Sequence, residues 1–285
     1  MTGFNIHFIY EDDKSAASTF ASTLIGEFGH SNLDDADHVV SIGGDGLLLQ
    51  ALRRGGGRKV CGLIPPGSNS RGFWTNRNIT SPEQLADCLT NGNHYEVKPL
   101  KADIIFADGS YASRTAYNDI SIRSVQTPTP QHLVEQYNLD PVDVSIQSAL
   151  LNLSVTFAGV TRGPDRIIGT GIILSTPYGS TAMGHNYGGS AIDLRLDAIS
   201  LTFMGAAGGL KPIVNPGSAS FDIEVGSPHK RPVLMTFDSF AIERNLEGSP
   251  VTAIHVEACP EDAAELVLTD DPASRTYSAF SPKPD

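Results

Sequence analysis

The chain has 285 residues, 40% of them hydrophobic, so it is long enough to bury a sizeable core as one large domain or two smaller ones. Its formal net charge is −12, and this acidic excess provides no basic field for nucleic acid or for an anionic membrane surface. A protein of this charge that handles phosphates must use backbone N–H groups, helix N-termini, a few Arg or Lys side chains, or a metal ion. We therefore expect neither a nucleic-acid partner nor a membrane partner.

Cysteine usage and the N-terminal segment bear on the cellular compartment. The cysteines, Cys61, Cys88 and Cys259, are scattered and form no CxxC or Cys/His cluster, so neither a disulfide framework nor a structural zinc site is expected. The sequence contains no run of about 18 apolar residues, the length that predicts a membrane-spanning helix. The N-terminal "MTGFNIHFIYEDDK" lacks the basic start and apolar stretch of a secretion signal. We expect a reduced, cytoplasmic protein.

The first 95 residues alternate between strand-like and helix-like segments. Apolar periodicity predicts strands over 5–10, 38–42 and 58–65, and helices over 14–27, 46–54 and 82–90. The last helix has a strong start, because Ser81 can cap it, Pro82 suits its first position and Glu83 complements the helix dipole. Strands that alternate with helices are typical of βαβ units, so we expect an α/β domain with a parallel sheet over residues 1–95.

From about residue 96 the sequence changes to short β-rich runs. In "ADIIFADGSYASRTA", the pair Asp108-Gly109 separates two strand-like segments and predicts a hairpin. Similar runs recur up to about residue 259, which favours an all-β, β-sandwich-like domain over residues 96–285. Prolines mark residues 125–141, which we expect to lie outside the strands, and we expect the C-terminal "SPKPD" to be mobile.

The first candidate for chemistry is "GGDG", residues 43–46, which follows the strand over 38–42. Gly44 and Gly46 would let the backbone approach a phosphate closely, and the N–H groups at the start of the next helix can face an anion. Asp45 could accept a proton from a hydroxyl group or hold a metal ion that bridges phosphates. The alternative is an ordinary turn, since Asp-Gly is a common turn pair.

Two further segments place polar residues at the edges of strands. "PPGSNSRGFW", 65–74, offers Asn69 and Arg71 to a nucleotide; the alternative is a solvated loop that closes a βαβ unit. In "AYNDISIR", 116–123, Asn118 and Asp119 interrupt an alternating strand pattern. An Asn can read a base edge or a ribose and an Asp can bind a ribose hydroxyl, whereas the alternative is a β-bulge or a turn.

The fourth segment is "GTGIILSTPYGSTAMGHNYGGSAI", residues 169–192. Its hydroxyl groups gather around a proline and a glycine, at Ser175, Thr176, Ser180 and Thr181. Such hydroxyls, together with backbone N–H groups that glycines expose, suit the ribose and phosphates of a nucleotide, and a mere connection rarely needs so long a stretch of Gly, Ser and Thr. The chain has no GxxxxGK[ST] motif, so it is not a P-loop protein.

Together these segments resemble the NAD kinase family, whose members phosphorylate the adenosine-ribose 2′-hydroxyl of NAD to make NADP. The family has a GGDG turn after an apolar strand, then an Asn-Glu pair, then a "DG…STPTGSTAY…GGP" block. Here they stand in the same order at 43–46, 118–119 and 169–189, and "KPIVNP", 211–216, resembles a later family segment. The "STPYGSTA" block separates this family from lipid kinases that share the GGDG turn.

The resemblance implies an N-terminal α/β domain and a C-terminal β-sandwich-like domain with the site between them. It implies that Asp45 is the general base on the 2′-hydroxyl and that Asn118 and Asp119 hold the adenine and ribose. The residues that we expect to bind substrate or nucleotide are Gly44, Gly46, Asn69, Arg71, Asn118, Asp119, Thr170, Ser180, Thr181, Ala182, Met183 and Asn186. The resemblance also implies ATP, Mg²⁺ or another divalent cation, and a homodimer or homotetramer in which a neighbouring subunit completes the NAD site.

Several positions depart from the family pattern. Asp119 replaces Glu and shortens the reach of the carboxylate by one methylene, Thr170 replaces the Asp of the "DG" pair, and Met183 replaces the Tyr of "STAY". Because Asp45 is retained, phosphorylation of NAD is the expected activity. Two alternatives remain open: a kinase for a different nucleotide-like or hydroxylated acceptor, and a non-catalytic NAD(P)-binding protein on the same fold.

Overall fold

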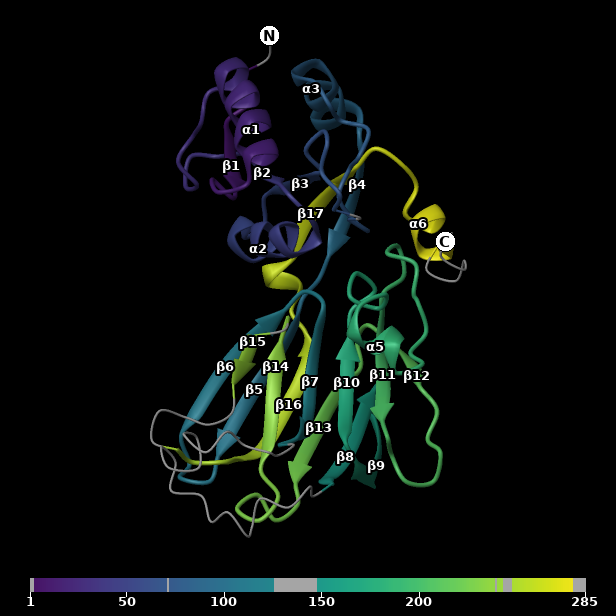
Figure 1. Ribbon diagram of the computed structural model, residues 1–285. Coiled ribbons are helices and arrows are strands. Elements are labelled where there is room, and N and C mark those ends of the chain that lie inside the picture. Colours follow the sequence, from purple (N-terminus) through teal and green to yellow (C-terminus); the bar gives the residue numbers. More distant parts are fainter. Residues whose placement is uncertain (1–2, 71, 126–147, 239, 243–247, 279–285) are drawn as a thin grey trace. The chain divides into compact units, whose positions relative to one another are not determined.

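The computed structural model describes residues 3–70, 72–125, 148–238, 240–242 and 248–278 (Figure 1). The chain divides into two compact units. Unit 1 comprises Met1–Lys98, Asp193–Arg195 and Pro260–Asp285, and unit 2 comprises Pro99–Ile192 and Leu196–Cys259. Within the described residues, none of the helices has the length and apolar character needed to cross a membrane.

Unit 1 is built on a five-stranded sheet in the order β1-β2-β3-β17-β4. Neighbouring strands run parallel from β1 (Ile6–Tyr10) through β2 (His38–Ile42) and β3 (Lys59–Leu63) to β17 (Ala264–Leu268), and β4 (Asn93–Val97) runs antiparallel. β2 is buried along its whole length, as a continuous apolar run predicts for a strand inside a parallel sheet.

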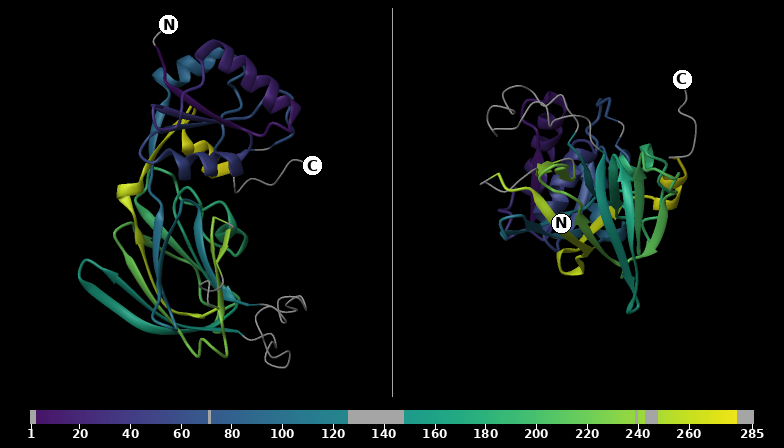
Figure 2. Two further views of the ribbon diagram at one scale, coloured as in Figure 1. Left: turned by 90° about the vertical axis from the view of Figure 1, so that its left-hand side faces the viewer. Right: turned by 90° about the horizontal axis from the view of Figure 1, so that it is seen from below.

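Helices pack on both faces of this sheet. Figures 1 and 2 show α1 (Ser15–Phe28) and α3 (Pro82–Asn91) on one face and α2 (Asp45–Gly55) on the other. The Oγ of Ser81 caps α3, because it accepts the N–H of Gln84 at 3.4 Å. The buried residues of α1 recur at helical spacing, at Ala17, Phe20, Ala21 and Leu24. The α/β architecture with a parallel sheet is confirmed.

The C-terminal segment belongs to unit 1, whereas the sequence-based boundary placed all of 96–285 in the β-rich domain. Strand β17 lies inside the first sheet, between β3 and β4, and is flanked by a 3-10 turn, η1 (Pro260–Asp262), and by α6 (Pro272–Ser278). The buried Asn76 holds the end of β17: its Nδ2 donates to the carbonyl oxygen of Val267 at 3.1 Å, and its Oδ1 accepts the N–H of Thr269 at 3.0 Å. Long-range pairing selects the sheet that a strand joins, and the local pattern "AELVL" does not encode that choice.

Unit 2 contains two six-stranded antiparallel sheets. One has the order β12-β11-β10-β7-β14-β15 and the other β6-β5-β16-β13-β8-β9. In chain order the strands are β5 (Leu100–Phe106), β6 (Tyr111–Ala116), β7 (Asp119–Ser124), β8 (Ala149–Phe157), β9 (Val160–Gly169), β10 (Gly171–Ser175), β11 (Ala198–Met204), β12 (Ile213–Pro216), β13 (Ser220–Val225), β14 (Val233–Phe237), β15 (Phe240–Ile242) and β16 (Val251–Ala258).

The core of unit 2 is one buried cluster that draws on both sheets. It includes Ile104 of β5 together with Ile120 and Ile122 of β7. Because successive side chains of a strand alternate between faces, Asp119 and Ser121 of β7 point away from this cluster. The β-sandwich-like architecture is confirmed, and the first sheet carries polar groups on the face opposite the core.

The Asp108-Gly109 hairpin is also confirmed. β5 and β6 pair in antiparallel fashion, Gly109 has a φ of +81°, and its N–H donates to the carbonyl oxygen of Phe106 at 2.9 Å. A left-handed φ of this kind favours glycine, which is why the pair signals a turn. Most of the expected excursion, residues 126–141, and the C-terminal "SPKPD" lie outside the described residues.

Candidate active site

The GGDG turn lies at the carboxyl end of β2, where α2 begins. Gly44 precedes the helix, Asp45 is its first residue, and Gly46 is exposed in its first turn. A Cβ atom on Gly44 would lie 2.6 Å from the Oγ of Ser70, so a larger residue would have to displace this side chain of the loop that follows β3. The turn thus brings Asp45 against that loop.

The backbone of this loop holds the carboxylate of Asp45. Oδ1 accepts the N–H groups of Trp74 at 2.9 Å and Thr75 at 3.2 Å, and Oδ2 accepts the N–H of Phe73. Since an ionised carboxylate has about four acceptor positions, both positions of Oδ1 are filled and Oδ2 keeps one, counting the hydrogen bonds from described residues. The arrangement therefore leaves Oδ2 able to take a proton from a hydroxyl group that reaches it.

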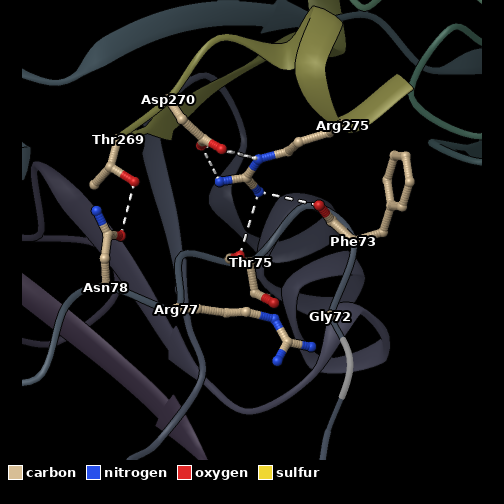
Figure 3. Close-up of a pocket in the computed structure, with 8 residues that line it drawn as sticks. All are labelled: Gly72, Phe73, Thr75, Arg77, Asn78, Thr269, Asp270 and Arg275. Carbon is tan, nitrogen blue, oxygen red and sulfur yellow. Dashed lines mark hydrogen bonds and ion pairs between the residues drawn. The ribbon is translucent and has the colours of Figure 1, made fainter. Parts of the chain in front are cut away.

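The same loop borders a cavity of about 410 Å³ in unit 1 (Figure 3). The cavity is lined from the loop and from the C-terminal segment, by Gly72, Phe73, Thr75, Arg77, Asn78, Thr269, Asp270 and Arg275. Arg77 donates to the carbonyl oxygen of Ser70 at 2.9 Å. The exposed guanidinium of Arg77 is a donor of the kind that recognises phosphate oxygens. Of the two loop residues expected to bind nucleotide, Asn69 is exposed and does not line this cavity, and Arg71 lies outside the described residues.

In unit 2, Asp238 holds the chain where Asn118 and Asp119 stand. Its carboxylate accepts the N–H groups of Tyr117 at 3.0 Å and Asn118 at 2.7 Å, and its own N–H donates to the carbonyl oxygen of Asp119 at 3.1 Å. Residues 117–118 form a bend between β6 and β7, so the Asn-Asp pair marks the beginning of a strand and does not interrupt one. This anchoring leaves Asn118 partly exposed and Asp119 buried.

Asp119 is a buried acid with an unusual pKa. Its side chain is 3% exposed, and burial raises the pKa to about 7; the negative charge of Asp238 adds to this effect and a backbone hydrogen bond from Met183 opposes it. Its Oδ1 has no hydrogen-bond partner among the described residues. Since an unpartnered buried polar atom is costly, this oxygen is suited to bind a polar group of a ligand.

Buried hydroxyl groups extend this polar surface across the sheet. Ser175 of β10 is in register with Asp119 of β7 on one side and with Ser200 of β11 on the other. Both serine Oγ atoms are buried and have no partner in the described part of the chain. A Cβ atom on Gly184 would lie 2.9 Å from the Oγ of Ser175, so the loop that follows β10 lies directly over the row.

That loop is tied to the bend before β7. The hydroxyl of Thr176 donates to the carbonyl oxygen of Tyr117, and the N–H of Thr176 donates to the carbonyl oxygen of Asn118 at 3.0 Å. A Cβ atom on Gly179 would lie 1.9 Å from that same Asn118 oxygen, so only glycine permits the approach. The "STPYGSTA" block can therefore lie against the Asn-Asp pair because Gly179 has no side chain at the point of closest approach.

Residues of this loop differ in what their side chains can offer. The hydroxyl of Ser180 is buried, donates to the carbonyl oxygen of Pro177 at 2.8 Å and accepts the N–H of Ile192 at 2.8 Å, so it braces the loop. Residues 181–183 are partly exposed, and Asn186, in the short helix α5 (Met183–Asn186), is exposed. Of these expected binding residues, Ser180 already uses its hydroxyl within the chain.

Thr170 lies apart from the other expected residues of unit 2. It precedes β10, whose far end, Ser175, is in register with Asp119. Five residues of extended strand span about 16 Å. Within one copy of the chain, the structure thus brings together Asn118, Asp119 and residues 181–183, and it does not bring Thr170 to them.

Sequence reasoning missed three residues that organise these sites: Asp238, Asp270 and Arg275. Asp238 had a usable signal, because an acid breaks the apolar run "VLMTFDSFAIE", and its φ of +51° fits a turn where the strand ends. Arg275 had no signal in the local sequence, because its carbonyl partners, Phe73 and Thr75, are 202 and 200 residues away in the chain.

Comparisons of the sequence with known proteins agree on one family. The family model described as ATP-NAD kinase C-terminal domain matches residues 134–268. The NAD kinase of Xanthomonas oryzae pv. oryzae is 29% identical over 231 residues, which cover 79% of each chain. The NAD kinase of Hyphomonas neptunium is 27% identical over 279 residues, which cover 95% of this chain and 94% of that protein.

Solved structures share the fold. Yeast NADH kinase, crystallised with NADH, matches with a TM-score of 0.72 and 16% identity over 97% of this chain and 87% of its own. An NAD kinase from Archaeoglobus fulgidus in complex with ATP matches with a TM-score of 0.69 and 17% identity over 96% of this chain and 98% of its own. At these identities, the structural likeness establishes the fold.

Proposed function

Because the chain belongs to the NAD kinase family, we propose that it transfers the γ-phosphoryl group of ATP to the adenosine-ribose 2′-hydroxyl of NAD and thus makes NADP. The observation that carries this proposal is the setting of Asp45. The GGDG turn places its carboxylate at the start of α2, three backbone N–H groups orient it, and Oδ2 keeps one acceptor position.

In this reaction the 2′-oxygen forms a bond to the γ-phosphorus of ATP, the bond from that phosphorus to the β–γ bridging oxygen breaks, and ADP leaves. Oδ2 of Asp45 accepts the proton that the hydroxyl loses. Because the transition state of phosphoryl transfer is loose, the protein contributes mainly positioning and charge stabilisation. A carboxylate that the backbone already orients needs little rearrangement when the hydroxyl arrives.

Unit 2 supplies the groups for the adenosine. The partly exposed amide of Asn118 suits an adenine edge, and the unpartnered Oδ1 of Asp119 suits a ribose hydroxyl or an amino group. Residues 181–183 lie beside Asp119, since the backbone of Met183 is hydrogen-bonded to its carboxylate. Asp119 is one methylene shorter than the family's Glu, and it is buried beneath the loop. A base or ribose must therefore come close to this loop to reach the carboxylate.

A divalent cation, normally Mg²⁺, would accompany ATP. Among the described residues no group of three or more His, Cys, Asp or Glu could hold a metal ion. Mg²⁺ is usually held by substrate phosphates, water and one or two carboxylates. When bound to the nucleotide, the cation neutralises charge on the β- and γ-phosphates.

We also propose a homodimer or homotetramer as the working form. Thr170, an expected NAD-site residue, lies about 16 Å of strand away from Asp119 in the same copy. In a homo-oligomer, Thr170 of one copy would complete the site of another. Size-exclusion chromatography with light scattering tests this, and a monomer that makes NADP at full rate would contradict it.

The proposed activity is tested by NADP formation from NAD, ATP and Mg²⁺, read through an NADP-specific dehydrogenase. We expect the wild-type chain to make NADP and Asp45→Asn to lower kcat by about 10²–10⁴-fold, the usual contribution of a general base. Circular dichroism and thermal unfolding check that the variant is folded, and Asp87→Asn, an exposed helix residue, is the matched control. A fully active Asp45→Asn variant would remove the proposed base.

If the folded wild-type chain forms no NADP, two alternatives remain: a kinase with another acceptor and a non-catalytic nucleotide-binding protein. A screen of hydroxylated acceptors with labelled ATP would reveal a kinase with another acceptor. Tight binding of NAD or NADP without turnover, measured by calorimetry, would indicate a nucleotide-binding protein. The same assay run with NADH as acceptor and with polyphosphate as donor defines the substrate preference.

A further inference from the structure

The loop segment 73–75 is held by two side chains that reach it from different parts of unit 1. Its N–H groups donate to the carboxylate of Asp45. Two of its carbonyl oxygens, those of Phe73 and Thr75, accept hydrogen bonds from Nη1 of Arg275 at 3.1 and 3.2 Å. Figure 3 shows Arg275 extending from the C-terminal segment to these carbonyl groups.

All five N–H donors of the Arg275 guanidinium have acceptors. Nε donates to Asp270 at 2.9 Å, Nη1 donates to the two loop carbonyls, and Nη2 donates to Oδ1 of Asn76 at 3.2 Å and to Asp270. The Arg275 side chain is 11% exposed, so these bonds form largely away from solvent. Only a planar fork of five donors can make this set, and a lysine has three.

The peptide group between Phe73 and Trp74 connects Arg275 to Asp45. Its C=O accepts from Arg275, and its N–H donates to Oδ1 of Asp45 at 2.9 Å. A trans peptide group is planar and rigid, with C=O and N–H pointing in opposite directions. If the carbonyl end loses its partner, the N–H that orients the carboxylate is no longer fixed.

We propose that Arg275 is a positioning residue for Asp45 and that the C-terminal segment, anchored through Asp270, is part of the catalytic machinery. The inference rests on the proposed function, since it assigns Asp45 the role of general base. Misplacing a reacting group by about 1 Å can lower a rate about 10²-fold. Removal of the guanidinium is therefore expected to lower kcat by about 10–100-fold and to leave the KM values for NAD and ATP nearly unchanged.

The first test uses Trp74, the single tryptophan of the chain, which is 3% exposed within the held segment. In Arg275→Met, we expect Trp74 emission to shift to the red and to become easier to quench with acrylamide. The matched control is Arg195→Met, because Arg195 also binds the C-terminal segment, through Asp271 at 3.4 Å, and is exposed. We call the hydrogen bonds of Arg275 to the carbonyl groups of Phe73 and Thr75 the clamp. This readout needs no enzymatic activity, so it separates the failure of the clamp from the failure of the proposed function.

The second test is a kinetic double-mutant cycle. Arg275→Met, Arg275→Lys and Asp270→Asn are each measured in the wild-type and Asp45→Asn backgrounds, with circular dichroism as a check of folding. If Arg275 acts through Asp45, its replacement lowers kcat in the wild-type background and has little effect once the carboxylate is gone. Arg275→Lys should recover only part of the rate, because three donors replace five.

Three outcomes would overturn the proposal: unchanged Trp74 emission, unchanged kcat, or an equal loss of kcat in both backgrounds. Inactivity of the wild-type chain would overturn it together with the proposed function, and an altered Trp74 signal would then show that the clamp orders the loop for another purpose.

Discussion

The buried acid Asp119 makes the stability of the protein depend on pH, and Asp119→Asn removes that dependence. Burial raises the pKa of Asp119 to about 7 in the folded chain, against about 3.9 for an aspartate in an unfolded chain. Between these two values the folded state keeps a proton that the unfolded state releases. The free energy of unfolding therefore falls as pH rises from about 4 to about 7.

The size of the effect follows from the difference in pKa. About three pH units at 1.36 kcal/mol each give about 4 kcal/mol, of which about 3 kcal/mol is lost between pH 5 and pH 8. Because the side chain is 3% exposed, solvent screening does little to reduce this figure. An asparagine has nearly the same shape and no charge at any pH, so the variant should lack this component.

Urea unfolding followed by circular dichroism at pH 5, 6, 7 and 8 measures the effect. We expect the wild-type free energy of unfolding to fall by about 3 kcal/mol more than that of Asp119→Asn over this range. Asp12→Asn, at an exposed turn, is the control and should follow the wild type. Parallel pH curves for wild type and Asp119→Asn would show that the carboxyl group is not the buried acid that we describe.

Three structural substitutions test the loops around the site by thermal or urea unfolding. Gly179→Ala should destabilise the fold by about 2–3 kcal/mol, because its Cβ would lie 1.9 Å from the carbonyl oxygen of Asn118; a neutral substitution would contradict this close approach. Ser180→Ala should cost about 1–3 kcal/mol, because the buried N–H of Ile192 loses its acceptor, and unchanged stability would mean that the serine does not brace the loop. Asn76→Ala should cost about 2–3 kcal/mol and should speed amide exchange in β17, and slow exchange in the variant would show that other contacts hold that strand.

Local sequence patterns specify the secondary-structure elements of unit 1 and the GGDG turn. The stretch over 38–55 forms β2, the turn and α2 as predicted, because an apolar run, two glycines and an amphipathic run each act within a few residues. The Asp108-Gly109 hairpin formed for the same reason, since the need for a left-handed φ is a local property. The NAD kinase resemblance also rested on short motifs, which is why the family could be identified from the residues.

Which segments meet depends on long-range contacts in the folded chain. β17 joins the first sheet, across the predicted boundary, because pairing with β3 and β4 buries a strand whose own pattern fits either domain. Asp238 meets Asn118 and Asp119 across about 120 residues of chain, and its negative charge adds to burial in raising the pKa of Asp119. Neither contact has a signature in the local sequence.

Thr170 and Arg275 both show that distance along the sequence does not predict distance in the folded chain. Thr170 is close to Ser175 in the sequence, yet an extended strand carries it to the far end of β10 from Asp119. Arg275 is distant in the sequence, yet the chain returns it to the loop that orients Asp45. Local pattern determines conformation over a few residues, whereas burial and long-range pairing determine which residues share a site, and only the folded chain specifies those partners.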